Sequence, residues 1–282
     1  MKEGASNPAN LSGRVALITG GAGHIGSAIA VGLAEQGARV FLLDRASTEP
    51  DRVAHYLGGE TLPIEGLPSD LEDEDRLRKT MAEFKNDVGQ LDIMVHAAGL
   101  AGTSELDGWA VPFEEQSLCA WDRAMRVNLS SAFLICQTLY PLMASNDHGS
   151  IILISSIYGS VGPDMALYKG TAMENPVGYG ASKGGLLQLM RYLSTLLAPK
   201  IRVNALSPGG VERGPEDVRR LAVAHVRHRG VVLLHHHEDR DFLQMRERRL
   251  RRLGHEARAV AQAEGRGRRC EQGERRRYSR GA

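Results

Sequence analysis

The sequence is poor in aromatic residues, which make up 5% of its 282 positions, and this argues against a sandwich or propeller of aromatic-rich strands. Its three cysteines, Cys119, Cys136 and Cys270, fit neither a zinc site nor a disulfide framework, which favours the reducing cytoplasm. No uninterrupted apolar run reaches the roughly 18 residues of a membrane span, and residues 1–13 lack the apolar core of a signal peptide. We therefore expect a cytoplasmic chain with no membrane partner.

The whole chain has almost no net charge, but its two parts carry opposite net charges. The formal net charge is +1, whereas residues 1–213 carry −7 and residues 214–282 carry +8, with 18 Arg and no Lys in the second stretch. This asymmetry predicts a domain over 1–213 and an atypical Arg-rich tail over 214–282, partly helical or disordered.

The first 213 residues alternate short apolar runs with helical patterns. The runs of strand length are Val15–Thr19, Arg39–Asp44, Leu62–Leu67, Leu91–His96, Ile151–Ser155 and Ile201–Leu206. The helical patterns are Ile25–Gln36, Glu72–Val88, Leu118–Ala144 and Tyr179–Ala198. Repeated strand–helix units predict an α/β fold, a Rossmann-type doubly wound parallel sheet with helices on both faces. Such sheets bind ligands beyond the carboxyl ends of their strands.

A glycine-rich loop, residues 20–26, follows the first run and precedes a helix. Glycines let the backbone turn sharply and approach a pyrophosphate at the helix N-terminus, although an ordinary strand–helix turn has the same composition. The second run ends in Asp44, 18 residues beyond Gly26. A carboxylate there accepts both ribose hydroxyls of NAD and repels the extra phosphate of NADP, an effect that Arg45 partly offsets. We expect NAD, with NADP the less favoured cofactor.

Tyr179 and Lys183 lie four residues apart and therefore on one face of a helix. A free phenol has a pKa of about 10, and a nearby ammonium lowers it toward the range of a useful acid or base. Such a pair also occurs by chance on helix surfaces. Here it follows the fifth strand, which ends in Ser155 and Ser156, where a hydroxyl can hold a substrate oxygen. Asn128 is a polar residue in apolar surroundings, which fits a helix-kinking residue as well as a functional one.

These motifs together resemble the short-chain dehydrogenase/reductase family, in its compact single-domain branch. The similarity runs from about Gly13 to about Val211. The family's glycine pattern matches Thr19, Gly20 and Gly26, with His24 in place of the middle glycine. Its N-A-A-G turn is present with His96 in place of the asparagine.

The resemblance implies a catalytic tetrad of Asn128, Ser156, Tyr179 and Lys183. In the family the tyrosine is the general acid or base, the serine polarises the substrate oxygen, and the lysine binds the nicotinamide ribose. The asparagine holds a water that links the lysine to solvent. The implied cofactor-binding residues are Gly20, Gly23, His24, Ile25, Gly26, Asp44, Arg45, Asp70, Leu71, Ala97, Ala98, Gly99, Tyr179, Lys183, Pro208, Gly209 and Val211.

The chain departs from the family pattern between Ser156 and Tyr179. Tyr179 lies 23 positions after Ser156, which exceeds the family's spacing, so Tyr158–Pro176 is interpreted as an insertion that lines the substrate pocket. Its polar members Asp164, Tyr168, Lys169 and Glu174 favour a polar substrate such as a sugar derivative or polyol, although loops are polar for solvent's sake too. Tyr168 is a rival phenol, but no lysine follows it four residues later.

The larger departure comes after Val211, where the family continues with a substrate-covering segment, a helix and a last strand. The run Val231–Leu234 leads into three histidines and is followed by an Arg-rich sequence, so the last strand is expected to be missing or replaced. We hypothesise that a frameshift or a mis-predicted gene end lies after Val211. Nucleic-acid binding by the arginines and metal binding by His235, His236, His237 and Glu238 are less favoured alternatives.

The leading interpretation is an NAD(P)-dependent oxidoreductase that interconverts a secondary alcohol and a ketone on a small molecule, without nucleic-acid or metal partners. The alternative is a non-catalytic NAD-binding protein, because loss of the last strand would cost several kcal/mol of a stability of only about 5–15 kcal/mol. An epimerase or dehydratase of the larger family branch is less favoured, since no substrate domain is present. The resemblance implies a homodimer or homotetramer.

Overall fold

All six predicted strands form, and they pair into one sheet. The computed structural model describes residues 10–101, 104, 106–146, 148–165, 175–209 and 211, together with the backbone of 233–235. Within them the strands are β1 (Val15–Thr19), β2 (Arg39–Asp44), β3 (Ile64–Pro68), β4 (Ile93–His96), β5 (Gly149–Ile154), β6 (Ile201–Ser207) and β7 (Leu233–His235).

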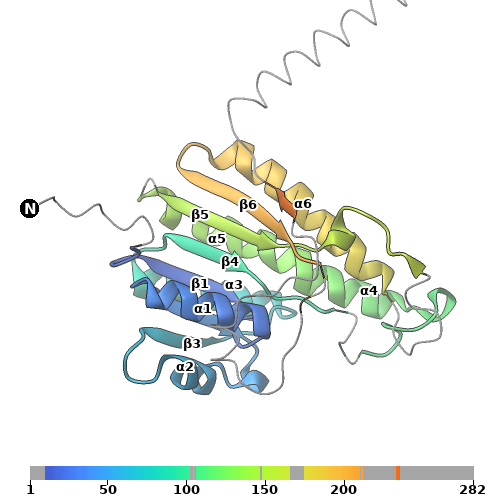
Figure 1. Cartoon of the computed structure of the whole chain (residues 1–282), viewed down its shortest axis with the longest axis horizontal. Helices are drawn as coiled ribbons and strands as arrows, with labels where there is room; N and C mark the ends of the chain where they lie inside the picture. The colour runs from blue at the N-terminus through green and yellow to red at the C-terminus, as the bar shows by residue number, and fades with distance from the viewer. Residues whose placement is uncertain are drawn as a thin grey trace, which may run out of the picture. The chain divides into compact units, whose positions relative to one another are not determined.

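The strand order is β3-β2-β1-β4-β5-β6-β7, and the pairs from β3 to β6 are all parallel. The chain runs outward from β1 to β3 and then returns to place β4 on the other side of β1, as Figure 1 shows. The order therefore reverses between β1 and β4. Parallel sheets of this type bind ligands at the carboxyl ends of the strands beside that reversal.

Helices lie on both faces of the sheet. They are α1 (His24–Glu35), α2 (Pro50–Gly58), α3 (Glu74–Val88), α4 (Leu118–Met125), α5 (Ser131–Ala144) and α6 (Val177–Leu197), and a π-helical turn, Arg126–Ser130, joins α4 to α5. The sequence analysis missed α2 and the π-helical turn. Proline at the first position of α2 and Asp51 in its first turn are ordinary helix-start signals.

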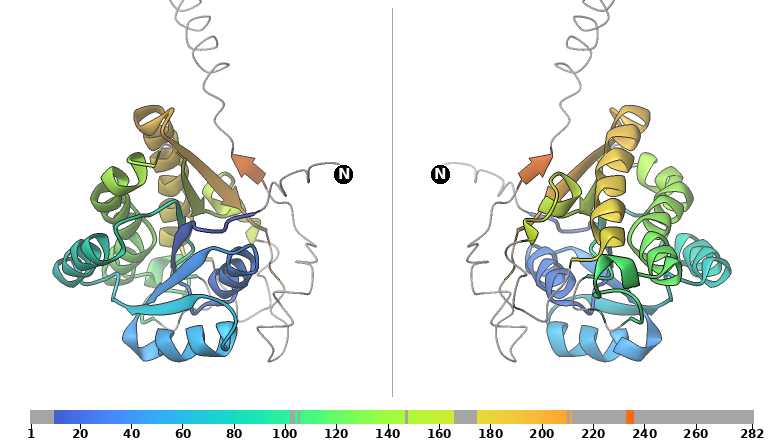
Figure 2. Two further views of the ribbon diagram at one scale, coloured as in Figure 1. Left: turned by 90° about the vertical axis from the view of Figure 1, so that its left-hand side faces the viewer. Right: turned by 90° about the vertical axis from the view of Figure 1, so that its right-hand side faces the viewer.

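Alternate residues of each strand feed two separate cores. On one face Leu17 and Leu43 pack with α3, α5 and α6, and on the other Ile18 and Leu42 pack with α1 and α2. The end-on views of Figure 2 show these two helical layers on opposite sides of the sheet. Leu186 and Met190, in the helical pattern predicted over Tyr179–Ala198, are buried in the first core and are 0% and 3% exposed.

The last strand is replaced rather than missing. Residues 233–235 pair antiparallel with β6, with Leu233 opposite Ser207 and His235 opposite Ala205. The pairing gives the outer edge of β6 a hydrogen-bonded partner over three residues.

One helical stretch resembles a membrane span in length and composition, although it contains no uninterrupted apolar run of that length. Leu118–Ala144, which spans α4, the π-helical turn and α5, is long and apolar enough by composition to cross a bilayer, although 44% of its most apolar window is buried inside the fold. Leu134, Ile135 and Leu139 of α5 belong to the first core. A core helix satisfies the same length and composition test.

Every described residue lies within the compact unit Met1–His236. The domain boundary after residue 213 therefore stays a prediction. The tail beyond 236, including Cys270, lies outside the described residues.

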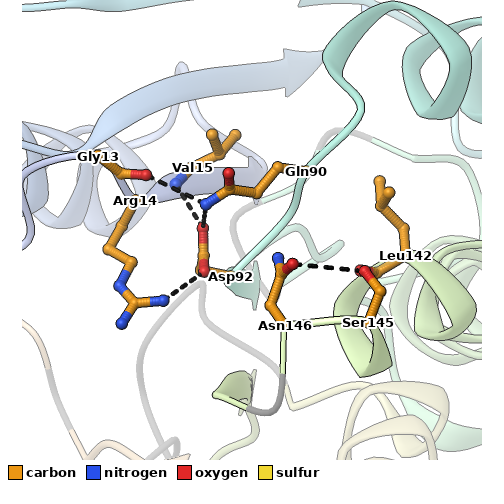
Figure 3. A network of polar contacts seen from close by, with 8 residues as sticks. All are labelled: Gly13, Arg14, Val15, Gln90, Asp92, Leu142, Ser145 and Asn146. Carbon is orange, nitrogen blue, oxygen red and sulfur yellow. Dashed lines mark hydrogen bonds and ion pairs between the residues drawn. The ribbon is translucent and has the colours of Figure 1, made fainter.

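The buried carboxylate of Asp92 connects two central strands at their amino ends, opposite the carboxyl ends of the strands. Asp92 is 1% exposed and accepts hydrogen bonds from the Arg14 guanidinium (2.7 Å), the Val15 backbone N–H (2.9 Å) and the Gln90 amide (2.7 Å), as Figure 3 shows. Burial is the largest single effect and opposes the charge, but the three hydrogen bonds together hold the pKa of Asp92 below its ordinary value of 3.8. Asp92 thus ties the starts of β1 and β4 together.

Replacing Asp92 by alanine is expected to lower the free energy of unfolding by about 2–3 kcal/mol, because the buried Val15 N–H and two partly buried donors, on Arg14 and Gln90, lose their acceptor. The pKa is lowered in the native state, so this stabilisation is present above pH 3.8 and is lost as the pH falls through the native pKa. Urea denaturation at neutral and acidic pH measures both effects. The control is Glu65→Ala, which removes the half-exposed Arg39–Glu65 pair and should cost about 0.5 kcal/mol. Equal losses in the two variants would contradict the assignment.

Candidate functional site

The glycine loop passes directly over the end of β4. Gly20 has φ +66°, and a Cβ there would lie 2.7 Å from the Ala98 backbone, while a Cβ on Gly26 would overlap the carbonyl oxygen of Gly20. Gly23 caps α1 without a side chain, so backbone N–H groups of the first turn remain available to a ligand. These contacts require glycine at both positions and leave the loop as bare backbone. A cradle of this kind fits a pyrophosphate.

Asp44 stands beside this loop. Its Oδ2 accepts a hydrogen bond from the Ala22 backbone N–H at 3.1 Å, and its Oδ1 accepts one from the Arg45 N–H at 2.9 Å. Asp44 is partly buried and Arg45 is exposed. The carboxylate is therefore held at the end of β2, next to the glycine loop.

The turn after β3 is anchored to α4. Asp70 is exposed, and its Oδ1 accepts a hydrogen bond from the Glu72 N–H at 2.9 Å, while Leu71 is buried in the first core. The Glu72 carboxylate accepts two hydrogen bonds from Arg123 of α4, at 2.8 and 2.7 Å. This bidentate pair holds the Asp70 turn against the helical layer.

A cleft of about 360 Å³ opens at the carboxyl ends of β1, β4, β5 and β6. It is lined by Gly20, Gly23, His24, Ile25, Gly26, Ala97, Gly99, Ala101, Ile154, Ser155, Tyr179, Lys183, Pro208, Gly209 and Val211. Most of the predicted cofactor-binding residues are thus brought together around one cavity. Those that do not line it are Asp44, Arg45, Asp70, Leu71 and Ala98.

Lys183 lies deep in this cleft with only 4% of its surface exposed. Its Nζ donates a hydrogen bond to the Ile154 carbonyl at 2.8 Å and lies 5.8 Å from the centroid of the Tyr179 ring. Burial lowers the pKa of Lys183 from 10.5 to about 8. The Tyr179 ring itself packs against a cluster around Trp109. A lysine with a perturbed pKa beside a phenol in a cleft is a candidate acid–base site.

Asn128 is fully buried in the π-helical turn and uses its whole side chain. Its Oδ1 accepts from the Leu100 N–H at 2.7 Å, and its Nδ2 donates to the Leu100 carbonyl at 3.1 Å and to the Ser182 hydroxyl at 2.9 Å. Ser182 precedes Lys183 on α6. Asn128 therefore connects the turn after β4 to the helix that carries the Tyr–Lys pair.

The two serines after β5 contact different partners. Ser155 donates a hydrogen bond to the Lys183 carbonyl at 2.8 Å, and Ser156, 5% exposed, accepts one from the Tyr158 N–H at 3.2 Å. A short 3-10 turn, Ile157–Gly159, then lies against α6 so closely that a Cβ on Gly159 would come within 2.7 Å of Lys183. The start of the insertion is thereby held on the helix that carries Tyr179.

Comparison with known proteins gives these features a family. Residues 14–218 match the short chain dehydrogenase family model. D-threitol dehydrogenase of Mycolicibacterium smegmatis is 32% identical over 199 residues, 70% of each chain. The 3-oxoacyl-(acyl-carrier-protein) reductase of Thermotoga maritima is 29% identical over 222 residues, 77% of this chain and 83% of the relative.

The chain belongs to the short-chain dehydrogenase/reductase family. Its relatives are oxidoreductases that act on CH–OH groups, and the family binds NAD(P). A crystal structure assigned as an NAD(P)-dependent gluconate 5-dehydrogenase from Beutenbergia cavernae, with NADP bound at low occupancy, has 30% identity and a TM-score of 0.62. It covers 72% of this chain and 74% of its own. The resemblance drawn from the sequence motifs is confirmed.

Two histidines replace family residues with different results. His24 begins α1, is exposed and lines the cleft where the family pattern has its middle glycine. His96 ends β4 and is fully buried. Of the polar residues predicted in the insertion, Asp164 is exposed, whereas Tyr168, Lys169 and Glu174 lie outside the described residues.

Sequence reasoning missed several residues that position the site. Trp109 is 2% exposed, donates a hydrogen bond to the Ala101 carbonyl at 2.7 Å and lies against Gly178 in the first turn of α6. Ala101 and Ile154 line the cleft. A lone tryptophan in a polar loop was the only signal for Trp109, and it does not distinguish a site residue from an ordinary core residue.

Proposed function

We propose that this chain interconverts a secondary alcohol and a ketone with NAD as the preferred cofactor, and that Asn128, Ser156, Tyr179 and Lys183 form its catalytic group. The observation that carries the proposal is the buried Lys183 ammonium beside the Tyr179 ring, in a cleft shared with the glycine loop. When bound, the nicotinamide cofactor supplies or accepts the hydride.

Each residue of the group has a distinct task in this proposal. Tyr179 takes the alcohol proton or returns it to the ketone oxygen, and the Lys183 ammonium favours the phenolate form. Ser156 keeps its hydroxyl hydrogen for the substrate oxygen, because its Oγ acts as the acceptor for Tyr158. Asn128 donates a hydrogen bond to the Ser182 hydroxyl and thereby holds α6 in position. The glycine loop and Gly99 carry no side chains, so the cofactor has room to contact the protein backbone there.

The preference for NAD rests on Asp44, whose carboxylate stands beside the glycine loop and would repel a 2′-phosphate. Replacing Asp44 by asparagine is expected to raise the Kd for NAD about tenfold. The ratio between the Kd values for NADP and NAD should fall as a result. Titration of both cofactors by protein fluorescence measures this. Arg45→Ala is the matched control, and it should weaken NADP alone. An unchanged NAD/NADP ratio in Asp44→Asn would contradict the preference.

The proposed substrate is a polar molecule such as a polyol or sugar derivative. The similarity to D-threitol dehydrogenase and to a gluconate 5-dehydrogenase supports it, as does the polar insertion. A second candidate, an alcohol with an apolar chain, is favoured by a groove of about 530 Å³ beside α6. The groove is lined in part by Phe113, Val161 and Met165, which are 75%, 57% and 54% exposed.

A substrate panel tests both candidates against the non-catalytic alternative. The full chain is first assayed for thermal stabilisation by NAD, and then for NADH absorbance with polyols, sugar acids and medium-chain secondary alcohols. Turnover of polyols or sugar acids alone supports the polar substrate, and turnover of the apolar alcohols alone supports the second candidate. Stabilisation by NAD without turnover of any of them would favour the non-catalytic NAD-binding protein.

We further propose a cytoplasmic homodimer or homotetramer whose contact surface lies on α5 and α6. Phe133 and Tyr140 of α5 are 48% and 42% exposed, and Tyr192 and Leu196 of α6 are 63% and 59% exposed. Apolar side chains on adjoining helices are typical of an interface. Light scattering of the purified chain measures its assembly state.

Among the described residues, no group of three or more His, Cys, Asp or Glu is placed to hold a metal ion.

A further inference from the structure

His96 connects the cofactor side of the sheet to the π-helical turn. It is the last residue of β4 and is 0% exposed. Its Nδ1 lies 2.9 Å from the Thr19 hydroxyl, at the end of β1, and its Nε2 lies 3.2 Å from the backbone carbonyl oxygen of Asn128. Both ring nitrogens therefore have a hydrogen-bond partner on a different element.

In a neutral ring, only one placement of the proton satisfies these contacts. The Asn128 carbonyl is purely an acceptor, so Nε2 must carry the ring proton and donate it. In a neutral ring Nδ1 is then an acceptor, which makes the Thr19 hydroxyl its donor. The Thr19 oxygen is left to accept from the Ala98 N–H, at 3.3 Å. Burial, reinforced by the charge of Lys183, lowers the pKa of His96 to about 3, so the ring is neutral at neutral pH.

The Asn128 carbonyl matters because of where it lies. In a π-helical turn the i→i−4 bonding is interrupted, and a carbonyl freed there needs another donor. His96 places a donor against the Asn128 carbonyl from β4, at 3.2 Å. Asn128 in turn uses its side chain to hold Leu100 and Ser182, and Ser182 is adjacent to Lys183. A continuous chain of hydrogen bonds thus runs from Thr19 through His96 and Asn128 to α6.

We propose that His96 is a positioning residue, whose Nε2–H tautomer, selected by the Asn128 carbonyl and accommodated by the Thr19 hydroxyl, fixes the π-helical turn so that Asn128 sets Lys183 beside Tyr179. The effect on turnover rests on the proposed function, whereas the tautomer does not. The tautomer is specific to this chain, because the family pattern has asparagine rather than histidine at this position.

The tautomer is tested on the wild-type protein without any substrate. Long-range proton–nitrogen spectra of histidine-labelled protein should show His96 with a protonated Nε2 and a bare Nδ1, unchanged over pH about 5 to 9. A protonated Nδ1, or a ring that titrates within this range, would overturn the proposal. This outcome is independent of whether the enzyme turns over any compound in the panel.

Two variants of similar length test the positioning role. His96→Gln keeps an amide donor for the Asn128 carbonyl, whereas His96→Met fills similar space without one. We expect His96→Met to lower kcat about tenfold with KM and the Kd for NAD nearly unchanged, and His96→Gln to stay within about threefold of wild type. Equal kcat in the two variants would overturn the role. If neither variant folds, the spectrum still tests the proton placement that the role requires, and a protonated Nδ1 overturns the proposal. If wild type itself shows no turnover, the proposed function fails while the tautomer result still stands.

Discussion

Tyr179→Phe is expected to lower kcat by about 1000-fold, because general acid–base catalysis by a positioned side chain contributes about 10²–10⁴-fold. The substitution removes one hydroxyl and keeps the ring that packs on the Trp109 cluster, so the fold and the cleft should persist. NAD should still raise the melting temperature of the variant. Steady-state NADH absorbance and a thermal shift titration measure the two effects separately.

Two phenol controls sharpen this experiment. Tyr192→Phe makes the same change on the exposed face of the same helix, where the side chain is 63% exposed, and should leave kcat unchanged. Tyr168→Phe tests the rival phenol of the insertion. Loss of turnover in Tyr168→Phe with retention in Tyr179→Phe would reverse the assignment of the acid–base residue.

Lys183→Met is expected to abolish most activity and yet stabilise the protein at neutral pH. A pKa shift from 10.5 to about 8 corresponds to a burial cost of about 3 kcal/mol for the charged lysine, at about 1.4 kcal/mol per unit. Methionine removes that cost but leaves the Ile154 carbonyl without its donor, a loss of about 1–2 kcal/mol. Burial is the larger effect, so the free energy of unfolding should rise by about 1–2 kcal/mol at pH 7. The activity loss should be about 100-fold or more.

The sign of this stability difference depends on pH. Below pH 8 the lysine is charged in both the folded and unfolded states, and the full burial cost applies. Between pH 8 and 10.5 the unfolded chain holds more protons than the native one, so wild-type stability gains with rising pH. Above 10.5 only the lost hydrogen bond remains and the variant becomes the less stable protein. Denaturation of both proteins at three pH values tests this reversal.

The matched control is Lys79→Met, which alters a side chain that is 77% exposed and should change stability by about 0.5 kcal/mol or less. A Lys183→Met variant that is destabilised equally at all pH values would contradict a buried, charged lysine in the native protein.

Local sequence was sufficient for the sheet and for the motifs at its carboxyl edge. The strands carry continuous apolar runs such as Val15–Thr19, because parallel strands are buried on both faces, and glycine and Asp44 mark where they end. The buried face of α6 follows from the four-residue spacing of Leu186 and Met190. These features depend on residues that are neighbours in the chain.

The elements that sequence reasoning missed depend on contacts between distant segments. The π-helical turn at Asn128 is contacted by His96, 32 residues earlier, and its one local signal is Asn128 itself, which in apolar surroundings fits a helix-kinking residue. His96 could be read only as a departure from a family motif, since its two partners lie on β1 and on the π-helical turn. The helix α2 was overlooked for a different reason. Its nine residues carry few apolar side chains, and it is held in place by packing on β3.

The attachment of the insertion at both ends has a consequence for how this enzyme can change. The 3-10 turn at Ile157–Gly159 is pressed onto α6, and the Val177 N–H donates to the Gln116 amide oxygen at 3.0 Å. The segment between these two anchors can therefore differ in length and composition without altering the spacing of the groups it connects. Transplanting loops from relatives between residues 160 and 176 offers a direct route to altered selectivity, with the reaction chemistry left in place.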